Sequence, residues 1–240
     1  GSNWIQQAKL TASDGAASDH FGCAVSLSGD TVLIGADGVA TAGGDNAGAA
    51  YAFVRLGSNW SQQARLIADD SYFWEFFGRS VSVSGDNAFI GVPEADPVGY
   101  NSGKAYIFRR SGGAWAQQAM LISSNGGMFG HCVSVSGDTA LVAAPSANAV
   151  HVFVDSGSNW SQEAVLHTDD AVGGDFFDGR RAEALDGERG GDGAPGQGVS
   201  QGGDVGVLLS GQIAHHAAGK AVAGASRIDH LGRRIGRQDG

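Results

Sequence analysis

One short motif that returns along the chain constrains the fold more than any other feature. Its copies span residues 21–36, 77–93 and 129–145, and each copy opens with Phe-Gly and contains Ser-Gly-Asp. A degenerate fourth copy begins at Phe177. Self-similarity at such a spacing is typical of an array of equivalent structural units, in which each unit packs only on its neighbours.

A tryptophan-led segment of the form Trp-x-Gln-Gln-Ala-x-Leu precedes each motif, with Glu replacing the second Gln in the last copy. The four segments begin at Trp4, Trp60, Trp115 and Trp160, so they are 56, 55 and 45 residues apart. In the first repeat we expect four strands, at residues 4–10, 24–27, 31–34 and 49–53. Four antiparallel strands per unit at this period predict propeller-type blades in an all-β fold.

Glycine and phenylalanine have structural roles in this prediction. The chain has 40 glycines and 4 prolines, as expected for many short strands joined by tight turns. The glycine of each Ser-Gly-Asp is expected to take a positive φ in a hairpin turn. The phenylalanine of each Phe-Gly is expected to lie in the core between blades. These residues are Gly29, Gly85 and Gly137, and Phe21, Phe77 and Phe129.

The motif resembles the FG-GAP repeat, the blade unit of integrin α-subunit propellers and of many secreted bacterial proteins. The Gly-Ala-Pro part or a variant of it occurs at Gly35-Ala36-Asp37, Gly91-Val92-Pro93, Ala143-Ala144-Pro145 and Gly193-Ala194-Pro195. The resemblance covers residues 1–177. It implies a β-propeller, usually of seven blades, outside the cell or on its surface, that binds or adheres rather than catalyses. With about three clear repeats, further repeats are expected in a longer parent chain.

The tail, residues 178–240, departs from the repeat pattern. It is rich in glycine and contains no Phe, Tyr or Trp. Two explanations stay open: a degenerate fourth blade followed by a disordered end, or a slip of the reading frame near Phe177.

The charge of the chain excludes some partners and leaves others. A formal net charge of −10 argues against a nucleic-acid partner, because phosphates need a basic surface. No apolar run is long enough to predict membrane insertion. Catalysis finds no support in the repeats, since residues 1–177 contain neither a metalloprotease-type histidine pair nor a Gly-x-Ser-x-Gly nucleophile elbow; the one Gly-x-Ser-x-Gly string, at residues 198–202, lies in the tail.

In the FG-GAP family calcium binds a loop of the form Asp-x-Asp-x-Asp-Gly, and that form is missing here. The matching loops still offer oxygen ligands for a hard cation. The candidates are Asp37, Asp45 and Asn46 in the first repeat, and Glu94, Asp96 and Asn101 in the second. The alternative is that these are solvated turn residues.

Four extra aromatic residues stand in the loop before the second Phe-Gly, where the first repeat has small polar residues. They are Tyr72, Phe73, Trp74 and Phe76. Exposed loop aromatics commonly anchor a protein or stack on a sugar ring, so we expect a partner-binding surface here. The alternative is that they seal a gap between blades. The sequence therefore favours a secreted binding module; a structural spacer, or a non-catalytic accessory region of a secreted hydrolase, remains an alternative.

Overall fold

The computed structural model describes residues 3, 5–157 and 159–167. Contacts divide the chain into two units, Gly1–Glu183 and Ala184–Gly240, and all the described residues lie in the first. The predicted fourth repeat at Phe177 and the predicted tail therefore lie outside the described residues. Within the described part, no helix is long and apolar enough to cross a membrane.

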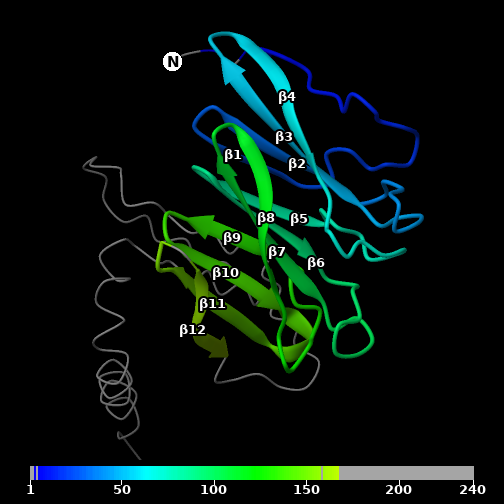
Figure 1. Cartoon of the computed structure of the whole chain (residues 1–240), viewed down its shortest axis with the longest axis vertical. Coiled ribbons are helices and arrows are strands. Elements are labelled where there is room, and N and C mark those ends of the chain that lie inside the picture. Colours follow the sequence, from blue (N-terminus) through cyan, green and yellow to red (C-terminus); the bar gives the residue numbers. More distant parts are fainter. Residues whose placement is uncertain (1–2, 4, 158, 168–240) are drawn as a thin grey trace, which may run out of the picture. The chain divides into compact units, whose positions relative to one another are not determined.

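The described residues form three four-stranded antiparallel sheets, each a simple meander of strands that are consecutive in sequence (Figure 1). The first contains β1 (Val25–Ser28), β2 (Thr31–Ala36), β3 (Ala49–Leu56) and β4 (Asn59–Leu66). The second contains β5 (Ser80–Ser84), β6 (Asn87–Val92), β7 (Lys104–Ser111) and β8 (Ala114–Leu121). The third contains β9 (Val133–Ser136), β10 (Thr139–Ala144), β11 (Ala149–Asp155) and β12 (Trp160–His167), with a 3₁₀ turn at Pro145–Ala147. The predicted all-β fold with blade-like sheets is confirmed.

The place of the tryptophan-led strand within each sheet was predicted wrongly. We expected it to open a blade, but it closes one: β4 pairs with β3, and Arg55 lies opposite Trp60. The described residues of the first such segment, 5–10, belong to no strand. The physical reason is the short turn at Gly57, with φ +63°, which folds the strand directly back on the one before it. The first blade therefore spans 25–66.

The aspartate of the Ser-Gly-Asp motif links the first hairpin of a sheet to its third strand and to the tryptophan-led fourth strand. Gly29, Gly85 and Gly137 have φ of 55°, 55° and 57°, as predicted. In the second sheet Asp86 Oδ1 accepts a bond of 2.7 Å from Arg110 Nε, and the guanidinium lies 5.1 Å from the centre of the Trp115 ring. The first sheet repeats this arrangement. The spacing of Asp and Trp that recurs between the repeats thus reflects one ion-pair and cation–π cluster in each of these two sheets.

Neighbouring sheets are joined by serine hydroxyls of the motif, which accept bonds from backbone amides of the next sheet. The bonds run from Val83 N to Ser26 Oγ, Gly85 N to Ser28 Oγ, Val135 N to Ser82 Oγ and Gly137 N to Ser84 Oγ, all between 3.0 and 3.1 Å. Because these bonds satisfy amides on the first strand of the next sheet and in the turn that follows it, the Ser-x-Ser pattern sets the register between blades.

The phenylalanine of the motif fills the space between sheets. Phe77 is buried with residues of the first two sheets, and its ring lies 5.5 Å from that of Tyr106. Phe129 is buried in the same way between the second and third sheets. Phe21 is only half-buried, against the outer face of the first sheet. The predicted core role is confirmed for Phe77 and Phe129, and burial of each ring contributes about 1.5–3 kcal/mol.

Candidate ligand-binding site

The aromatic loop, residues 71–76, connects β4 to the second Phe-Gly and lies against the loop that follows β2. Trp74 N donates to Asp45 O at 2.9 Å, and Phe76 N donates to Asn46 O at 3.0 Å. A glycine allows this close approach: a Cβ at Gly44 would lie 2.8 Å from Cβ of Phe73. The glycine-rich loop of the first repeat therefore supports the aromatic loop of the second.

Two aromatic residues of this loop have a left-handed backbone. Trp74 has φ +61° and Phe76 has φ +59°. The equivalent positions are left-handed in every repeat, and they hold Ser18 and His20 in the first, Gly126 and Met128 in the third. For an L-residue this conformation costs about 1–2 kcal/mol. The backbone is thus a property of the repeat, and the second repeat differs in placing an aromatic ring at the first of the two positions, where the first repeat has serine and the third has glycine.

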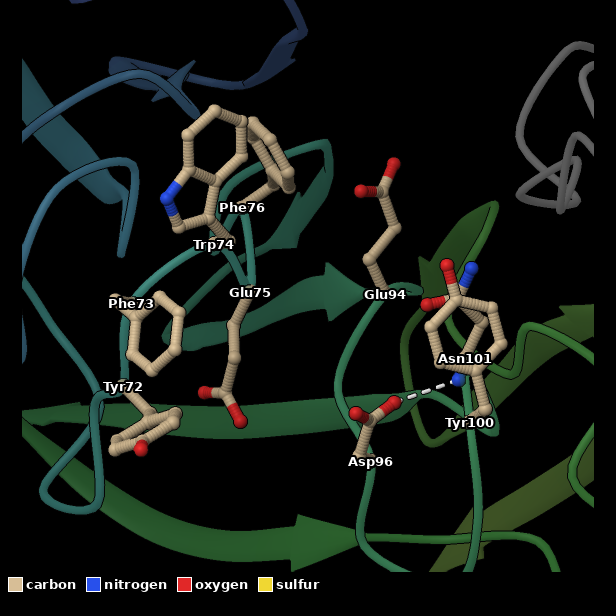
Figure 2. Close-up of a pocket in the computed structure, with 9 residues that line it drawn as sticks. All are labelled: Tyr72, Phe73, Trp74, Glu75, Phe76, Glu94, Asp96, Tyr100 and Asn101. Carbon is tan, nitrogen blue, oxygen red and sulfur yellow. Dashed lines mark hydrogen bonds between the residues drawn. The ribbon is translucent and has the colours of Figure 1, made fainter.

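This backbone points Trp74 and Phe76 to one side of the loop and Glu75, between them, to the other (Figure 2). The two rings meet edge to face, with centroids 5.8 Å apart. Glu75 is 8% exposed, whereas Trp74 is 56% exposed. The loop therefore uses the carboxylate as its anchor and presents aromatic surface to solvent.

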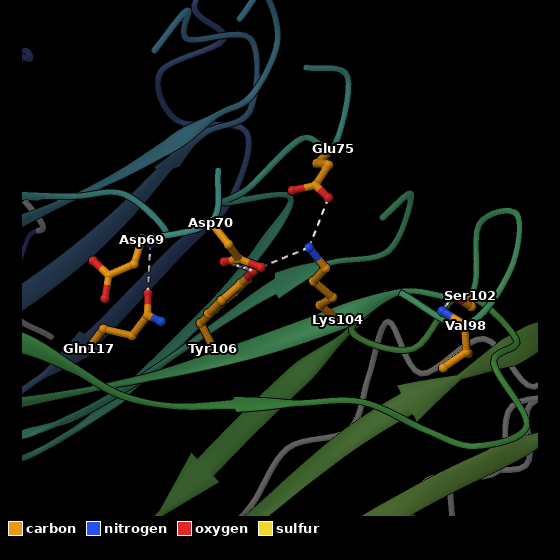
Figure 3. Close-up of polar contacts among 8 residues, drawn as sticks. All are labelled: Asp69, Asp70, Glu75, Val98, Ser102, Lys104, Tyr106 and Gln117. Carbon is orange, nitrogen blue, oxygen red and sulfur yellow. Dashed lines mark hydrogen bonds and ion pairs between the residues drawn. The ribbon is translucent and has the colours of Figure 1, made fainter. Parts of the chain in front are cut away.

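Glu75 is anchored by a buried lysine at the start of β7 (Figure 3). Lys104 Nζ lies 2.9 Å from Glu75 Oε1 and 3.1 Å from Asp70 Oδ2. Tyr106 OH donates to Asp70 Oδ1 at 2.6 Å. These four residues fix both ends of the aromatic loop to the second sheet, and the role of Lys104 and Tyr106 was not predicted from the sequence.

Two opposing effects set the pKa values of Lys104 and Asp70: burial, and hydrogen bonds to the partner side chains. Burial alone would lower the pKa of Lys104, but the bonds to Glu75 and Asp70 outweigh burial and raise this pKa above its ordinary value. Burial would raise the pKa of Asp70, yet the bonds from Tyr106 and Lys104 hold it below its ordinary value. Burial, followed by the bond to Asp70, raises the pKa of Tyr106. Both shifts favour the charged forms of Lys104 and Asp70.

The aromatic loop and the acidic loop of the second repeat line one pocket, here the aromatic–acidic pocket, of about 320 Å³ (Figure 2). Its lining residues are Tyr72, Phe73, Trp74, Glu75, Phe76, Glu94, Asp96, Tyr100 and Asn101. Two sets that were predicted separately, the partner-binding aromatics and the second-repeat cation ligands, are thus brought together. The volume is at the lower end of the usual range for small-molecule sites.

Tyr100 is a residue of this pocket that sequence reasoning missed. It is 88% exposed and also lines a second pocket of about 210 Å³. The second pocket is lined by Val98, Gly99, Tyr100, Ser102, Ser124, Asn125, Gly126 and Gly127. The signal that could have found Tyr100 is the one that found the aromatic loop: an aromatic residue in a loop of small and polar residues.

The first-repeat candidates for a cation are placed elsewhere. Asp37 is buried, and its carboxylate lies 2.9 Å from Arg79 Nη1 and 2.8 Å from His20 Nδ1. The hydrogen bond to Asp37 raises the pKa of Arg79 above its ordinary value. The backbone carbonyls of Asp45 and Asn46 hold the aromatic loop. The structure thus assigns these three residues contacts within the fold.

The second-repeat candidates lie close together at one wall of the pocket. Asn101 N donates to Asp96 Oδ1 at 2.6 Å, and Glu94 Oε1 lies 3.6 Å from Arg79 Nη2. Among the described residues, no three acidic, histidine or cysteine side chains form a group that could hold a metal ion. A calcium site at Glu94, Asp96 and Asn101 stays a prediction.

Comparison with known proteins bears on the repeats. The sequence profile of the FG-GAP repeat matches residues 4–53 and 60–108. The chain contains FG-GAP repeats. Each matched segment contains the motif, the first two strands of one sheet and most of its third strand, and the second segment also contains β4 of the first sheet from residue 60 on. No curated protein sequence matches this FG-GAP chain significantly.

Among solved structures, the FG-GAP chain is similar to the periplasmic gluconolactonase PpgL of Pseudomonas aeruginosa, with 13% sequence identity and a TM-score of 0.31. The match covers 63% of this chain and 58% of the lactonase. At this TM-score the likeness is too distant to bear on activity.

Proposed function

We propose that this FG-GAP repeat segment is an extracellular binding module that takes a protein or carbohydrate ligand in the aromatic–acidic pocket. The observation that carries the proposal is the exposure of three aromatic rings at its wall: Tyr72, Phe73 and Trp74 are 58%, 49% and 56% exposed. Clustered aromatic side chains in contact with water are characteristic of interaction sites, because their apolar area is removed from water only when a partner binds.

The strained backbone at Trp74 supports the same proposal. The equivalent positions hold a serine and a glycine; glycine takes this backbone without steric cost, and a bulky residue such as tryptophan is an outlier there. Strain of this kind persists where the surrounding structure enforces it, and it is concentrated at functional sites. A ring whose only role was to fill the core would be buried, whereas Trp74 faces solvent.

The alternatives differ in what they ask of this surface. A structural spacer needs only smooth polar loops, and the exposed rings of the aromatic loop argue against it. A non-catalytic accessory region of a secreted hydrolase would use the same pocket to hold its substrate. The extracellular location and a role in binding rather than catalysis rest on the FG-GAP repeats.

A ligand panel tests the proposal with one loop variant. The full chain and its Trp74→Gly variant are titrated by isothermal calorimetry with neutral oligosaccharides, a lysine-rich peptide and an acidic peptide. We expect at least one probe to bind the wild-type protein and to lose at least tenfold in affinity with the variant. Equal binding to both proteins, or binding to neither, would refute the proposed site.

A further inference from the structure

Two pockets of different character meet at Tyr100. The aromatic–acidic pocket contains rings and the carboxylates of Glu94 and Asp96, whereas the lining of the second pocket contains no charged side chain. Tyr100 lines both, and Figure 2 shows its ring beside Asn101 at the edge of the first. An extended ligand that fills both would therefore pass over one exposed aromatic ring.

The polar groups of both pockets suit neutral hydroxyl groups. Carboxylate oxygens accept hydrogen bonds from hydroxyls, and an asparagine amide both accepts and donates them. The first pocket supplies Glu94, Asp96 and Asn101, and the second supplies Ser124 and Asn125, both exposed. Each pocket thus offers a ligand at least one aromatic ring to stack on and polar groups that form hydrogen bonds.

We propose that the two pockets form one binding groove for a neutral oligosaccharide that crosses Tyr100. This inference rests on the proposed function and names its ligand class. Sugar rings with equatorial hydroxyls have flat C–H faces that stack on aromatic rings, while their hydroxyls reach polar groups at the ring edge. The competing ligand is a basic peptide. One of its lysine or arginine side chains would need only the carboxylates of the first pocket and would leave the uncharged second pocket unused.

The charge around the groove separates neutral from acidic sugars. Glu94 and Asp96 lie at the pocket wall, and Asp69 and Asp70 lie at the start of the aromatic loop. The nearby cations Arg79 and Lys104 are held in ion pairs with carboxylates of the protein. A uronic-acid or sulfated chain would therefore be repelled.

Calorimetric titration of the full chain tests the inference. The probes are neutral tetrasaccharides of glucose, N-acetylglucosamine, mannose and xylose, their monosaccharides, a galacturonate tetrasaccharide and a lysine-rich peptide. We expect a neutral tetrasaccharide to bind at least tenfold more tightly than its monosaccharide. Tyr100→Ala should abolish this advantage of length, and Leu56→Ala, which removes an exposed side chain on β3, should preserve it.

Several results would overturn the inference, and they differ in whether the proposed function survives. Equal affinity for the tetrasaccharide and monosaccharide would refute the two-pocket groove, and so would tighter binding of the galacturonate. Absence of any neutral tetrasaccharide binding stronger than about 1 mM would refute the ligand class. If the lysine-rich peptide bound instead and Trp74→Gly abolished that binding, the pocket would be a peptide site and the proposed function would stand.

Discussion

The left-handed backbone at Trp74 predicts an inverted order of stability for two small substitutions. Trp74→Gly and Trp74→Ala remove the same ring and its contact with Phe76, so they differ only in backbone terms: how well each residue tolerates φ +61°, and how much conformational freedom each loses on folding. Alanine keeps the strain of about 1–2 kcal/mol, while glycine loses about 0.5–1 kcal/mol more conformational freedom on folding. The glycine variant should therefore be more stable than the alanine variant by about 0.5–1 kcal/mol.

The matched control is Phe73, an exposed aromatic of the same loop whose φ is not positive. There Phe73→Gly should be less stable than Phe73→Ala by about 0.5–1 kcal/mol, the ordinary order. Urea unfolding followed by circular dichroism measures both pairs, and equal m-values make the comparison valid. If Trp74→Ala were instead more stable than Trp74→Gly by about 0.5–1 kcal/mol, the ordinary order seen at position 73, position 74 would carry no strain and the argument from strain to function would fail.

Three further predictions concern what holds the loop and what it binds. Lys104→Met should lower the free energy of unfolding at pH 7 by about 3–5 kcal/mol, because it leaves the Glu75 carboxylate buried without its cation. Gly44→Ala should destabilise the fold by about 1–3 kcal/mol and weaken ligand binding, because the added Cβ lies 2.8 Å from Cβ of Phe73. Excess calcium, compared with chelator, should raise the melting temperature of the wild-type chain but not that of Asp96→Asn.

Each of these predictions has its own control. Adding Glu75→Gln to Lys104→Met should restore most of the lost stability, and failure to do so would show that Lys104 acts through packing instead. Gly57→Ala also falls at a positive φ, +63° against +119° at Gly44, but has open space around the added Cβ, so its cost should be smaller and ligand binding should be unchanged. An unchanged melting temperature with calcium would remove the cation from the account and leave the pocket intact.

The pH dependence of the lysine cluster follows from the directions of its pKa shifts. The pKa of Asp70 is lowered from 3.8, so its contribution to stability is present above pH 3.8 and is lost as pH falls through the lower folded value. The pKa of Lys104 is raised from 10.5, so its contribution is present below pH 10.5 and is lost as pH rises through the higher folded value. The effect of Lys104→Met should therefore be largest between these limits.

The repeat pattern predicted the fold because local turns determine it. Ser-Gly-Asp places a positive-φ glycine between two alternating runs, and that arrangement defines a hairpin wherever it occurs. The same pattern could not assign the tryptophan-led strand to one blade or the next, since a repeating sequence has no marked beginning. The turn at Gly57, rather than the position of Trp60 ahead of the motif, decides that assignment.

The site could be predicted only in pieces. Unusual composition identified the aromatic loop, and the FG-GAP resemblance identified Glu94, Asp96 and Asn101. Their meeting in one pocket depends on how the loop before β5 faces the loop after β6, which no local pattern specifies. Lys104 was missed because a lysine at the start of a strand is usually solvated, and its burial depends on Asp70 and Glu75 from another loop.

The most direct test of the central claim is ¹⁹F NMR of the chain labelled with fluorotryptophan. The chain has 5 tryptophans, and the resonance of Trp74 is assigned by its loss in Trp74→Phe. Addition of the tightest-binding probe should shift the Trp74 resonance and leave those of Trp60, Trp115 and Trp160 unchanged, because these three close their sheets on β4, β8 and β12. A bound probe that shifted another tryptophan and not Trp74 would place the ligand elsewhere and contradict the account.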